Sequence, residues 1–326
     1  MTRNARSRAW CLVALVALGS VFVNTGTRQV GAQEASSGRF VEGEDPLYGR
    51  ELQNYVTWNL WQGVHWDTIN MYVPTDRLWY RVKDSRVHPR AVAVQETCRP
   101  AYLDLRAKLV PLGYSGAFYS SNDDAALPCD QHGNAIFWRG ECFGGVNQCV
   151  DIGPFLNQSP ANLNEDDTRG YACGRSRDFS AFYCSAHLTN KNSSAPDTEA
   201  YARAQSIEYR QKSEAVQGWV GIPTVFMGDF NIDYRTGNSG FQAWRNQHRE
   251  ADACDGLVVP AGGCYNTFSI EAGQVRDEKL DYIFASKGPG HCFRADDPSF
   301  YLGPYSGPGG PVISDHVLVR GYFGCP

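Results

Sequence analysis

Short runs rich in β-branched and aromatic residues recur along nearly the whole chain, separated by stretches with helical patterning. Such runs, bounded by Gly, Pro, Asn, Asp and Ser, are typical of β-strands. Strands are expected near residues 55–60, 91–94, 134–138, 179–186, 223–227, 280–284 and 316–323, with 169–175 as the hairpin partner of the 179–186 run. Strands and helices mixed in one long domain predict an α+β fold of layered sheets covered by helices.

Helical patterning is clear in three places. One helix is expected from Pro100, which suits the first turn of a helix, and it carries apolar residues at helical spacing. The longest is expected from Asp197, a favourable N-cap, to about Gly218, a typical C-terminal stop. The third follows Ser239. These helices are the expected covering layers of the sheets.

The first 32 residues have the pattern of a secretory signal peptide. A basic start with Arg3, Arg6 and Arg8 precedes the apolar run 11–23, and Val30-Gly31-Ala32 offers small residues for cleavage. The apolar run is shorter than the roughly 20 residues of a membrane span, and no later stretch is apolar enough for one. We therefore expect a secreted, extracellular protein without a transmembrane segment. A flexible lead-in at 33–52 would precede one folded domain at 53–326.

The charge of the chain gives no general attraction to polyanions. Its formal net charge is −5, and loss of the four arginines before residue 32 would make it −9. An acidic surface neither attracts nucleic acid nor anionic membrane. A phosphate substrate stays possible, because a bound cation would supply positive charge locally.

The cysteines indicate an oxidising compartment. Of eleven in the sequence, ten remain without Cys11. An even number in an exported protein predicts disulfides, and the absence of any Cys-x-x-Cys pair argues against zinc. Local bridges such as Cys142–Cys149 and Cys254–Cys264 fit the spacing, which does not fix the connectivity.

Polar residues follow directly on five short apolar, strand-like runs. They are Asn59, Gln95-Glu96, His187, Asp229 with Asn231, and Ser314-Asp315-His316. Strand ends hold polar groups rigidly at the rim of a core, where sites are commonly built. Each alone has a structural explanation: a turn for Asp229, a satisfied core histidine for His187, a helix cap for Glu96. Together they offer two histidines, three carboxylates and three carboxamides, which predicts a site.

These motifs resemble, in order, those of the endonuclease/exonuclease/phosphatase superfamily. They are Trp58-Asn59, Gln95-Glu96, His187-Leu188, Gly228-Asp229-Phe230-Asn231, Leu280-Asp281-Tyr282 and Ser314-Asp315-His316. The match spans about residues 55–323. It implies a four-layer α/β/β/α sandwich of two packed mixed β-sheets flanked by helices, with 53–326 as the catalytic domain. Within the superfamily, the motifs are most similar to pancreatic-type deoxyribonucleases and the catalytic subunit of cytolethal distending toxin.

The resemblance and the chemistry of the side chains agree on a metal and a phosphate site. Glu96 is a hard oxygen ligand suited to Mg²⁺, with Mn²⁺ as a substitute, and Asn59 and Asp315 would complete or orient the metal shell. Arg169 resembles a phosphate-contacting arginine of the toxin. A surface arginine on an edge strand is the alternative for this residue.

The remaining motif residues are assigned to proton transfer and charge stabilisation. His187 and Asn231 can donate hydrogen bonds to the phosphate as charge develops. Asp229 and His316 are alternative candidates for activating water, and Asp281 resembles the carboxylate partner of the last histidine in the family. The other histidines match no motif and are expected to be structural or exposed: His65, His88, His132, His248 and His291.

The sequence therefore predicts a secreted, Mg²⁺-dependent phosphodiesterase that hydrolyses phosphodiester bonds by attack of water on phosphorus. A DNA endonuclease is the first expectation, with nucleic acid as partner. A sphingomyelinase-like phospholipid phosphodiesterase or a phosphoinositide phosphatase stays open, because these enzymes share most of the motifs. A catalytically inactive binding protein, such as a toxin subunit, disagrees with the complete set of acid, base and metal groups. The loop 287–311 should border the cleft, as a stapled loop or with aromatics that stack on bases.

Overall fold

The computed structural model is described for most of the chain beyond residue 52. The described residues are 53–60, 71–84, 88–122, 129, 131–142, 149–160, 167–178, 181–190, 198–233, 239–250, 279–287, 300–302, 314, 316 and 318–323. The expected signal peptide at 1–32 and lead-in at 33–52 lie outside them, as do Asp315, the Cys254–Cys264 pair and nearly all of the loop 287–311. Among the described residues, no helix is both long and apolar enough to cross a membrane.

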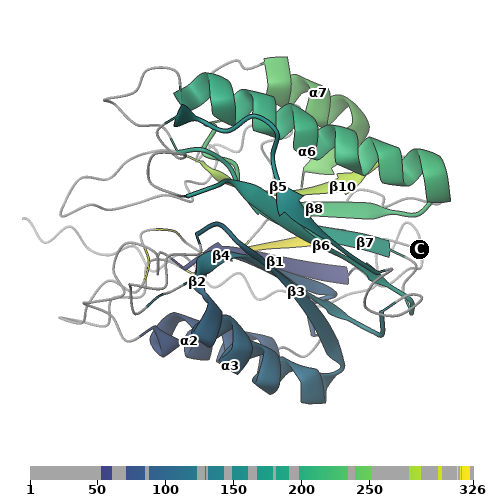
Figure 1. The fold of residues 1–326 in the computed structure, drawn as a ribbon. Coiled ribbons are helices and arrows are strands. Elements are labelled where there is room, and N and C mark those ends of the chain that lie inside the picture. The colour runs from purple at the N-terminus through teal and green to yellow at the C-terminus, as the bar shows by residue number, and fades with distance from the viewer. Residues whose placement is uncertain are drawn as a thin grey trace, which may run out of the picture. The chain divides into compact units, whose positions relative to one another are not determined.

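The first sheet is mixed and holds the strand that opens the described part of the chain (Figure 1). Its strands are β1 (Gln53–Asn59), β2 (Ala91–Cys98), β3 (Tyr114–Ser120), β4 (His132–Arg139), β11 (Phe300–Leu302) and β12 (Leu318–Phe323), in the order β11-β12-β1-β2-β4-β3. β1 and β2 run parallel, with Asn59 opposite Gln95. Asn59, which ends β1, therefore lies beside Gln95 and Glu96 near the end of β2.

The second sheet is also mixed. It contains β5 (Val150–Pro154), β6 (Gly170–Ser176), β7 (Ala181–His187), β8 (Thr224–Asp229), β9 (His248–Glu250) and β10 (Asp281–Ser286), in the order β5-β6-β7-β8-β10-β9. β7 and β8 are parallel, with His187 opposite Asp229. β10 runs antiparallel to β8 and begins with Asp281 opposite the same Asp229. Three motif residues are thus placed side by side by register alone.

Helices cover the outer face of each sheet (Figure 1). They are α2 (Tyr72–Lys83) and α3 (Arg99–Leu109) with the 3₁₀ turn η1 (Val110–Leu112) on the first sheet, and α6 (Thr198–Val220) and α7 (Ser239–Gln247) on the second. Leu78 of α2 and Leu105 of α3 are buried against Val92 of β2. Tyr209 of α6 and Trp244 of α7 are buried against Phe226 of β8.

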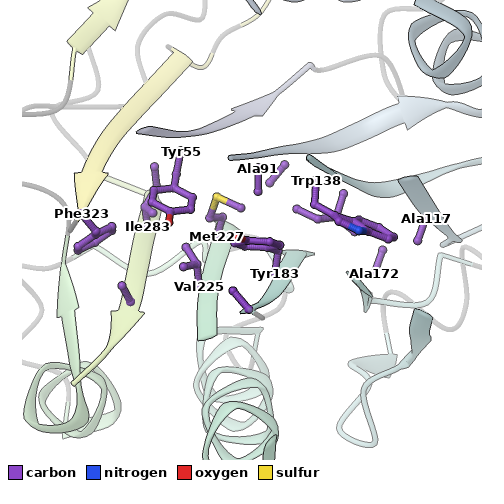
Figure 2. Close-up of a cluster of buried hydrophobic side chains, with 14 of the residues drawn as sticks. Tyr55, Ala91, Ala117, Trp138, Ala172, Tyr183, Val225, Met227, Ile283 and Phe323 are labelled. Atoms are coloured by element: carbon purple, nitrogen blue, oxygen red, sulfur yellow. The ribbon is translucent and has the colours of Figure 1, made fainter. Parts of the chain in front are cut away.

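The inner faces of the two sheets form a separate core (Figure 2). Tyr55 and Trp138 come from the first sheet, and Tyr183, Met227 and Ile283 from the second, and all five are at most 1 % exposed. Burying each such side chain contributes roughly 1.5–3 kcal/mol to folding. Helices, sheet, sheet and helices are the four layers of the α/β/β/α sandwich, so the predicted α+β fold class is confirmed.

Three disulfides join described residues: Cys98–Cys129, Cys142–Cys149 and Cys173–Cys184. The expected Cys142–Cys149 bridge is confirmed. Cys173 and Cys184 lie opposite one another in the β6–β7 hairpin, so their bridge fixes the hairpin that ends with His187. All six described cysteines are therefore in disulfides, and none of them offers a thiolate to a metal.

Candidate active site

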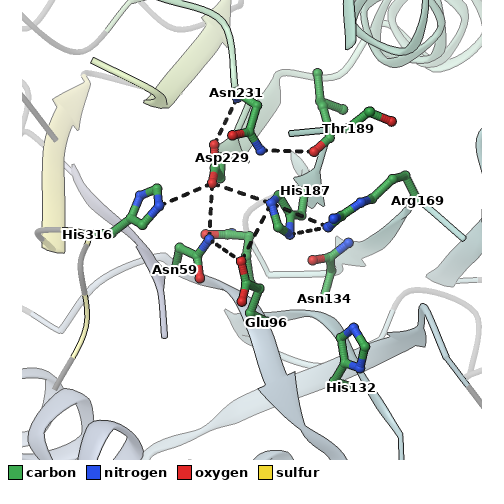
Figure 3. Close-up of polar contacts among 12 residues, drawn as sticks. Asn59, Glu96, His132, Asn134, Arg169, His187, Thr189, Asp229, Asn231 and His316 are labelled. Atoms are coloured by element: carbon green, nitrogen blue, oxygen red, sulfur yellow. Dashed lines mark hydrogen bonds and ion pairs between the residues drawn. The ribbon is translucent and has the colours of Figure 1, made fainter. Parts of the chain in front are cut away.

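The predicted site residues converge where the two sheets meet (Figure 3). The structure brings together Asn59, Glu96, Arg169, His187, Asp229, Asn231, Asp281 and His316, each of which contacts at least one other member. Asp315 lies outside the described residues, and its role as a metal ligand stays a prediction. Strands of both sheets therefore contribute to one site.

Asn59 links carboxylates from the two sheets. Its side-chain amide donates 3.0 Å hydrogen bonds to Oε1 of Glu96 and to Oδ2 of Asp229. Asn59 and Asp229 are buried, while the Glu96 side chain keeps 16 % of its surface exposed. One amide nitrogen donates to both acids. Asn59 therefore holds the two carboxylates close together against the repulsion between their like charges.

The backbone at the site adopts conformations that few residues accept. Glu96 has a φ of +50° and lies where the β2–β4 register shifts, between Val94 and Thr97. The left-handed region is uncommon for residues other than glycine and is concentrated at functional sites. The bulge turns the Glu96 side chain out of the regular alternation of β2 and towards Asn59.

Gly228 and Asn231 explain the Gly-Asp-Phe-Asn motif. Gly228 has a φ of +144°, and a Cβ there would lie 2.0 Å from the carbonyl oxygen of Ala186, so only glycine fits. Asn231 has a φ of +51°, which asparagine tolerates better than most residues. Its backbone N–H donates to Oδ1 of Asp229 at 2.8 Å, and its side-chain amide donates to the Leu188 carbonyl at 3.0 Å. The turn therefore fixes the Asp229 carboxylate.

His316 is held by Asp281 in one tautomer. Nδ1 of His316 lies 2.7 Å from Oδ2 of Asp281, whose side chain is fully buried. A carboxylate can only accept, so we assign the ring proton to Nδ1. Nε2 then carries a lone pair, and it lies 3.5 Å from Oδ2 of Asp229.

His187 is held in the opposite tautomer by Arg169. Nη1 of Arg169 lies 2.6 Å from Nδ1 of His187. A guanidinium has no acceptor, so Nδ1 must accept and the ring proton is assigned to Nε2. Nε2 lies 3.5 Å from Oδ2 of Asp229 and 3.8 Å from Oε1 of Glu96. Burial, followed by the nearby Arg169 charge, holds the pKa of His187 well below its usual range, so this imidazole is a neutral donor.

Asp229 lies between these two rings and titrates near neutrality. Burial raises the pKa of its carboxyl to about 7, and the charge of Asp281 adds to the rise. His316, the Asn59 amide and the Asn231 backbone N–H act in the opposite direction, lowering this pKa. The lone pair of His316 Nε2 faces the carboxylate oxygen, so a single shared proton relieves their repulsion, and Asp229 and His316 form one acid–base unit.

A search against protein families finds one match over most of the chain. The model described as "Endonuclease/Exonuclease/phosphatase family" matches residues 56–316. The chain belongs to the endonuclease/exonuclease/phosphatase family. The predicted resemblance is thereby confirmed, and enzymes of this family are generally metal-dependent hydrolases. No curated protein matches the sequence.

Solved structures of the family share the fold at low sequence identity. A family protein from Bacteroides vulgatus is 18 % identical, with a TM-score of 0.54 over 84 % of this chain and 99 % of its own. The human Nocturnin catalytic domain with bound sulfate is 16 % identical, with a TM-score of 0.53 over 84 % and 94 %. TDP2 of D. rerio, complexed with a single-strand DNA product, is 13 % identical, with a TM-score of 0.54 over 83 % and 98 %.

The donors of the site fit the divalent metal that endonuclease/exonuclease/phosphatase enzymes use. Among the described residues, Asp229, Asp281 and His316 each offer a ligand atom within 4.8 Å of the others. This group differs from the predicted ligands Glu96, Asn59 and Asp315, although Asn59 bridges Glu96 to Asp229. Carboxylates dominate both sets, which suits a hard cation.

Two residues beside the site, Asp167 and His132, belong to none of the motifs found in the sequence. Asp167 contacts Nη2 of Arg169 through Oδ2 at 3.1 Å, and its Oδ1 lies 3.4 Å from Nε2 of His132. His132, expected to be structural or exposed, lies beside the site (Figure 3) and contacts Asp167.

Proposed function

We propose that this family member is a secreted, Mg²⁺-dependent phosphodiesterase that hydrolyses DNA. One observation carries the proposal: two histidines, His187 and His316, both direct Nε2 at Asp229, with the Glu96 carboxylate alongside. Such a site offers a proton acceptor, a proton donor and a hard cation ligand to one reacting group. The DNA product in the D. rerio TDP2 complex supports nucleic acid as the substrate class.

The acceptor side of the site would activate water. The Asp229–His316 unit takes a proton from water, with Nε2 of His316 as the acceptor. Asp281, bonded to Nδ1 of His316, stabilises the imidazolium that forms when Nε2 receives this proton. The water, as it loses its proton, attacks phosphorus and displaces the sugar oxygen.

The donor side would bind the phosphate. The Nε2–H of His187 points into the same space and donates to a non-bridging phosphate oxygen as negative charge develops. Arg169 adds a permanent positive charge next to it. Glu96, and Asp229 beside it, would hold a divalent cation, which would supply polarisation of a phosphoryl oxygen and charge for the leaving oxygen.

Export is proposed on the disulfides and on residues 1–32. Disulfides such as Cys98–Cys129 and Cys173–Cys184 persist in oxidising compartments and are rare in the cytosol. The signal-peptide pattern of the first residues agrees with this. N-terminal sequencing of the protein released into the medium tests it, with cleavage expected after Ala32.

The substrate is tested by offering the purified protein plasmid DNA, RNA, sphingomyelin and phosphoinositides in parallel, each with Mg²⁺. We expect nicking of the plasmid, loss of it in His187→Ala, and retention in His88→Ala. His88 is a suitable control because its ring contacts the Val82 carbonyl, outside the site. Faster hydrolysis of either lipid than of both nucleic acids would overturn the proposed substrate class.

A further inference from the structure

Arg169 is held between His187 and an acid that no motif contains. Nη1 of its guanidinium contacts Nδ1 of His187 at 2.6 Å, and Nη2 contacts Oδ2 of Asp167 at 3.1 Å. The side chains of all three are at most 13 % exposed. A guanidinium is planar with donors in fixed directions, so a carboxylate on one side sets the direction of the donors on the other.

The segment that carries Asp167 is fixed to its surroundings on both sides. The Thr168 backbone N–H donates to the Ser121 carbonyl at 2.8 Å, and the Thr168 hydroxyl lies 2.8 Å from that of Tyr119. The Arg169 backbone N–H donates to Oε1 of Gln158 at 2.8 Å. The backbone at 168–169 is therefore fixed, and the direction of the long Arg169 side chain is left to its own contacts.

We propose that Asp167 is a positioning residue, which holds the Arg169 guanidinium on Nδ1 of His187 and so keeps the His187 proton on Nε2. This inference rests on the proposed function of the same site. Asp281 contacts His316 directly and places a proton on Nδ1, whereas Asp167 acts through a guanidinium, which places a lone pair on Nδ1. Because Arg169 lies between Asp167 and His187, the Nε2 of His187 is a hydrogen-bond donor, whereas the Nε2 of His316 is an acceptor.

The other oxygen of Asp167 faces the first sheet. Oδ1 lies 3.4 Å from Nε2 of His132, which opens β4 in the first sheet, whereas Arg169 and His187 belong to the β6–β7 hairpin of the second. Asp167 therefore joins the two sheets on the Arg169 side, as Asn59 joins them on the Asp229 side.

The kinetic test compares Asp167→Asn with Asp167→Glu and with Asp151→Asn. Loss of a charge-assisted hydrogen bond predicts a drop in kcat of about 10- to 100-fold for Asp167→Asn, with partial recovery in Asp167→Glu. Asp151→Asn removes an equivalent carboxylate from Lys212 at the edge of the same sheet and should leave kcat unchanged. In a His187→Ala background, Asp167→Asn should cost nothing further, since both changes remove one function.

A readout independent of activity separates this inference from the proposed function. The ¹⁵Nη–H signals of Arg169, assigned by their loss in Arg169→Lys, should be resolved in the wild type because the guanidinium is immobilised, and should collapse in Asp167→Asn. Unchanged Arg169 signals, or an equal loss of kcat with and without His187, would overturn the inference. Wild-type protein inactive on every phosphodiester would instead refute the proposed function, while the Arg169 signals would still decide whether Asp167 holds the guanidinium.

Discussion

Replacing Asp281 with asparagine should disable His316 without removing it. Oδ2 of Asp281 lies 2.7 Å from Nδ1 of His316 in a fully buried setting. The change removes a charge-assisted hydrogen bond and the attraction between a carboxylate and the imidazolium formed during catalysis. Together these contributions amount to about 3–5 kcal/mol at the dielectric that suits buried sites, which corresponds to a loss of turnover of about 10²- to 10⁴-fold.

The double variant makes this prediction specific. His316→Ala should lower turnover by about 10²- to 10⁴-fold, the usual contribution of a positioned acid or base. If Asp281 acts only through this ring, Asp281→Asn combined with His316→Ala should be no slower than His316→Ala, within about threefold. Single-turnover cleavage of a labelled DNA duplex with Mg²⁺ measures all four rates.

Control experiments exclude a general loss of structure. Circular dichroism of His316→Ala should match that of the wild type at the assay temperature, although its melting temperature should fall, because the change removes the His316 contact of the buried Asp281 carboxylate. His88→Ala serves as the silent histidine variant in place of His132→Ala, because His132 contacts Asp167. If the losses of Asp281→Asn and His316→Ala multiplied, the assignment of the two residues to one unit would be refuted.

The other predictions concern the metal, His187, the buried acid and the disulfides. Excess EDTA should abolish activity, and Mg²⁺ or Mn²⁺ should restore it; full activity in EDTA would contradict the carboxylate site. His187→Ala should lower turnover by about 10²- to 10⁴-fold in the same assay, with the fold retained by circular dichroism. In metal-free protein, the pKa of Asp229 is raised on folding from 3.8 to about 7, so the folded state binds a proton more tightly than the unfolded state. The resulting contribution to the free energy of unfolding is complete below about pH 3.8 and is lost as the pH rises through about 7. The melting temperature relative to Asp229→Asn should therefore fall between pH 4 and pH 8, by the equivalent of at most about 4 kcal/mol, and a constant difference would argue against the shift. Reducing agent should lower the melting temperature by an amount equivalent to about 2–5 kcal/mol per lost bridge, whereas ten free thiols in unreduced, denatured protein would exclude the disulfides.

The layered fold could be predicted because hydrophobic pattern and strand spacing are local properties of the sequence. The helices from Pro100 and after Ser239 begin within one residue of their predicted starts. Helix α2 was missed because its N-cap, Met71, makes no side-chain cap hydrogen bond and its Tyr80 is exposed, which weakens the apolar stripe. Its stability comes from packing of Leu78 on the sheet, which sequence does not display.

The same distinction separates the predicted site residues from the missed ones. His187 and Asp229 end neighbouring parallel strands, and Asn59 lies opposite Gln95, next to Glu96, so each pair is brought together by parallel register along the chain. Asp167 and His132 have no such position: they precede or open strands of different sheets and meet only because the sheets pack together. A positioning contact made across tertiary structure leaves no pattern along the chain.

Cleavage of a short DNA duplex in H₂¹⁸O tests the central claim most directly. With Mg²⁺, we predict that the phosphate end of the product carries one ¹⁸O by mass spectrometry, since water activated by the Asp229–His316 unit attacks phosphorus. The label should be present already in a single turnover, because no protein side chain forms a covalent bond to the phosphate. A cleaved product without ¹⁸O on phosphorus, or no cleavage at all by the metal-loaded protein, would contradict the account.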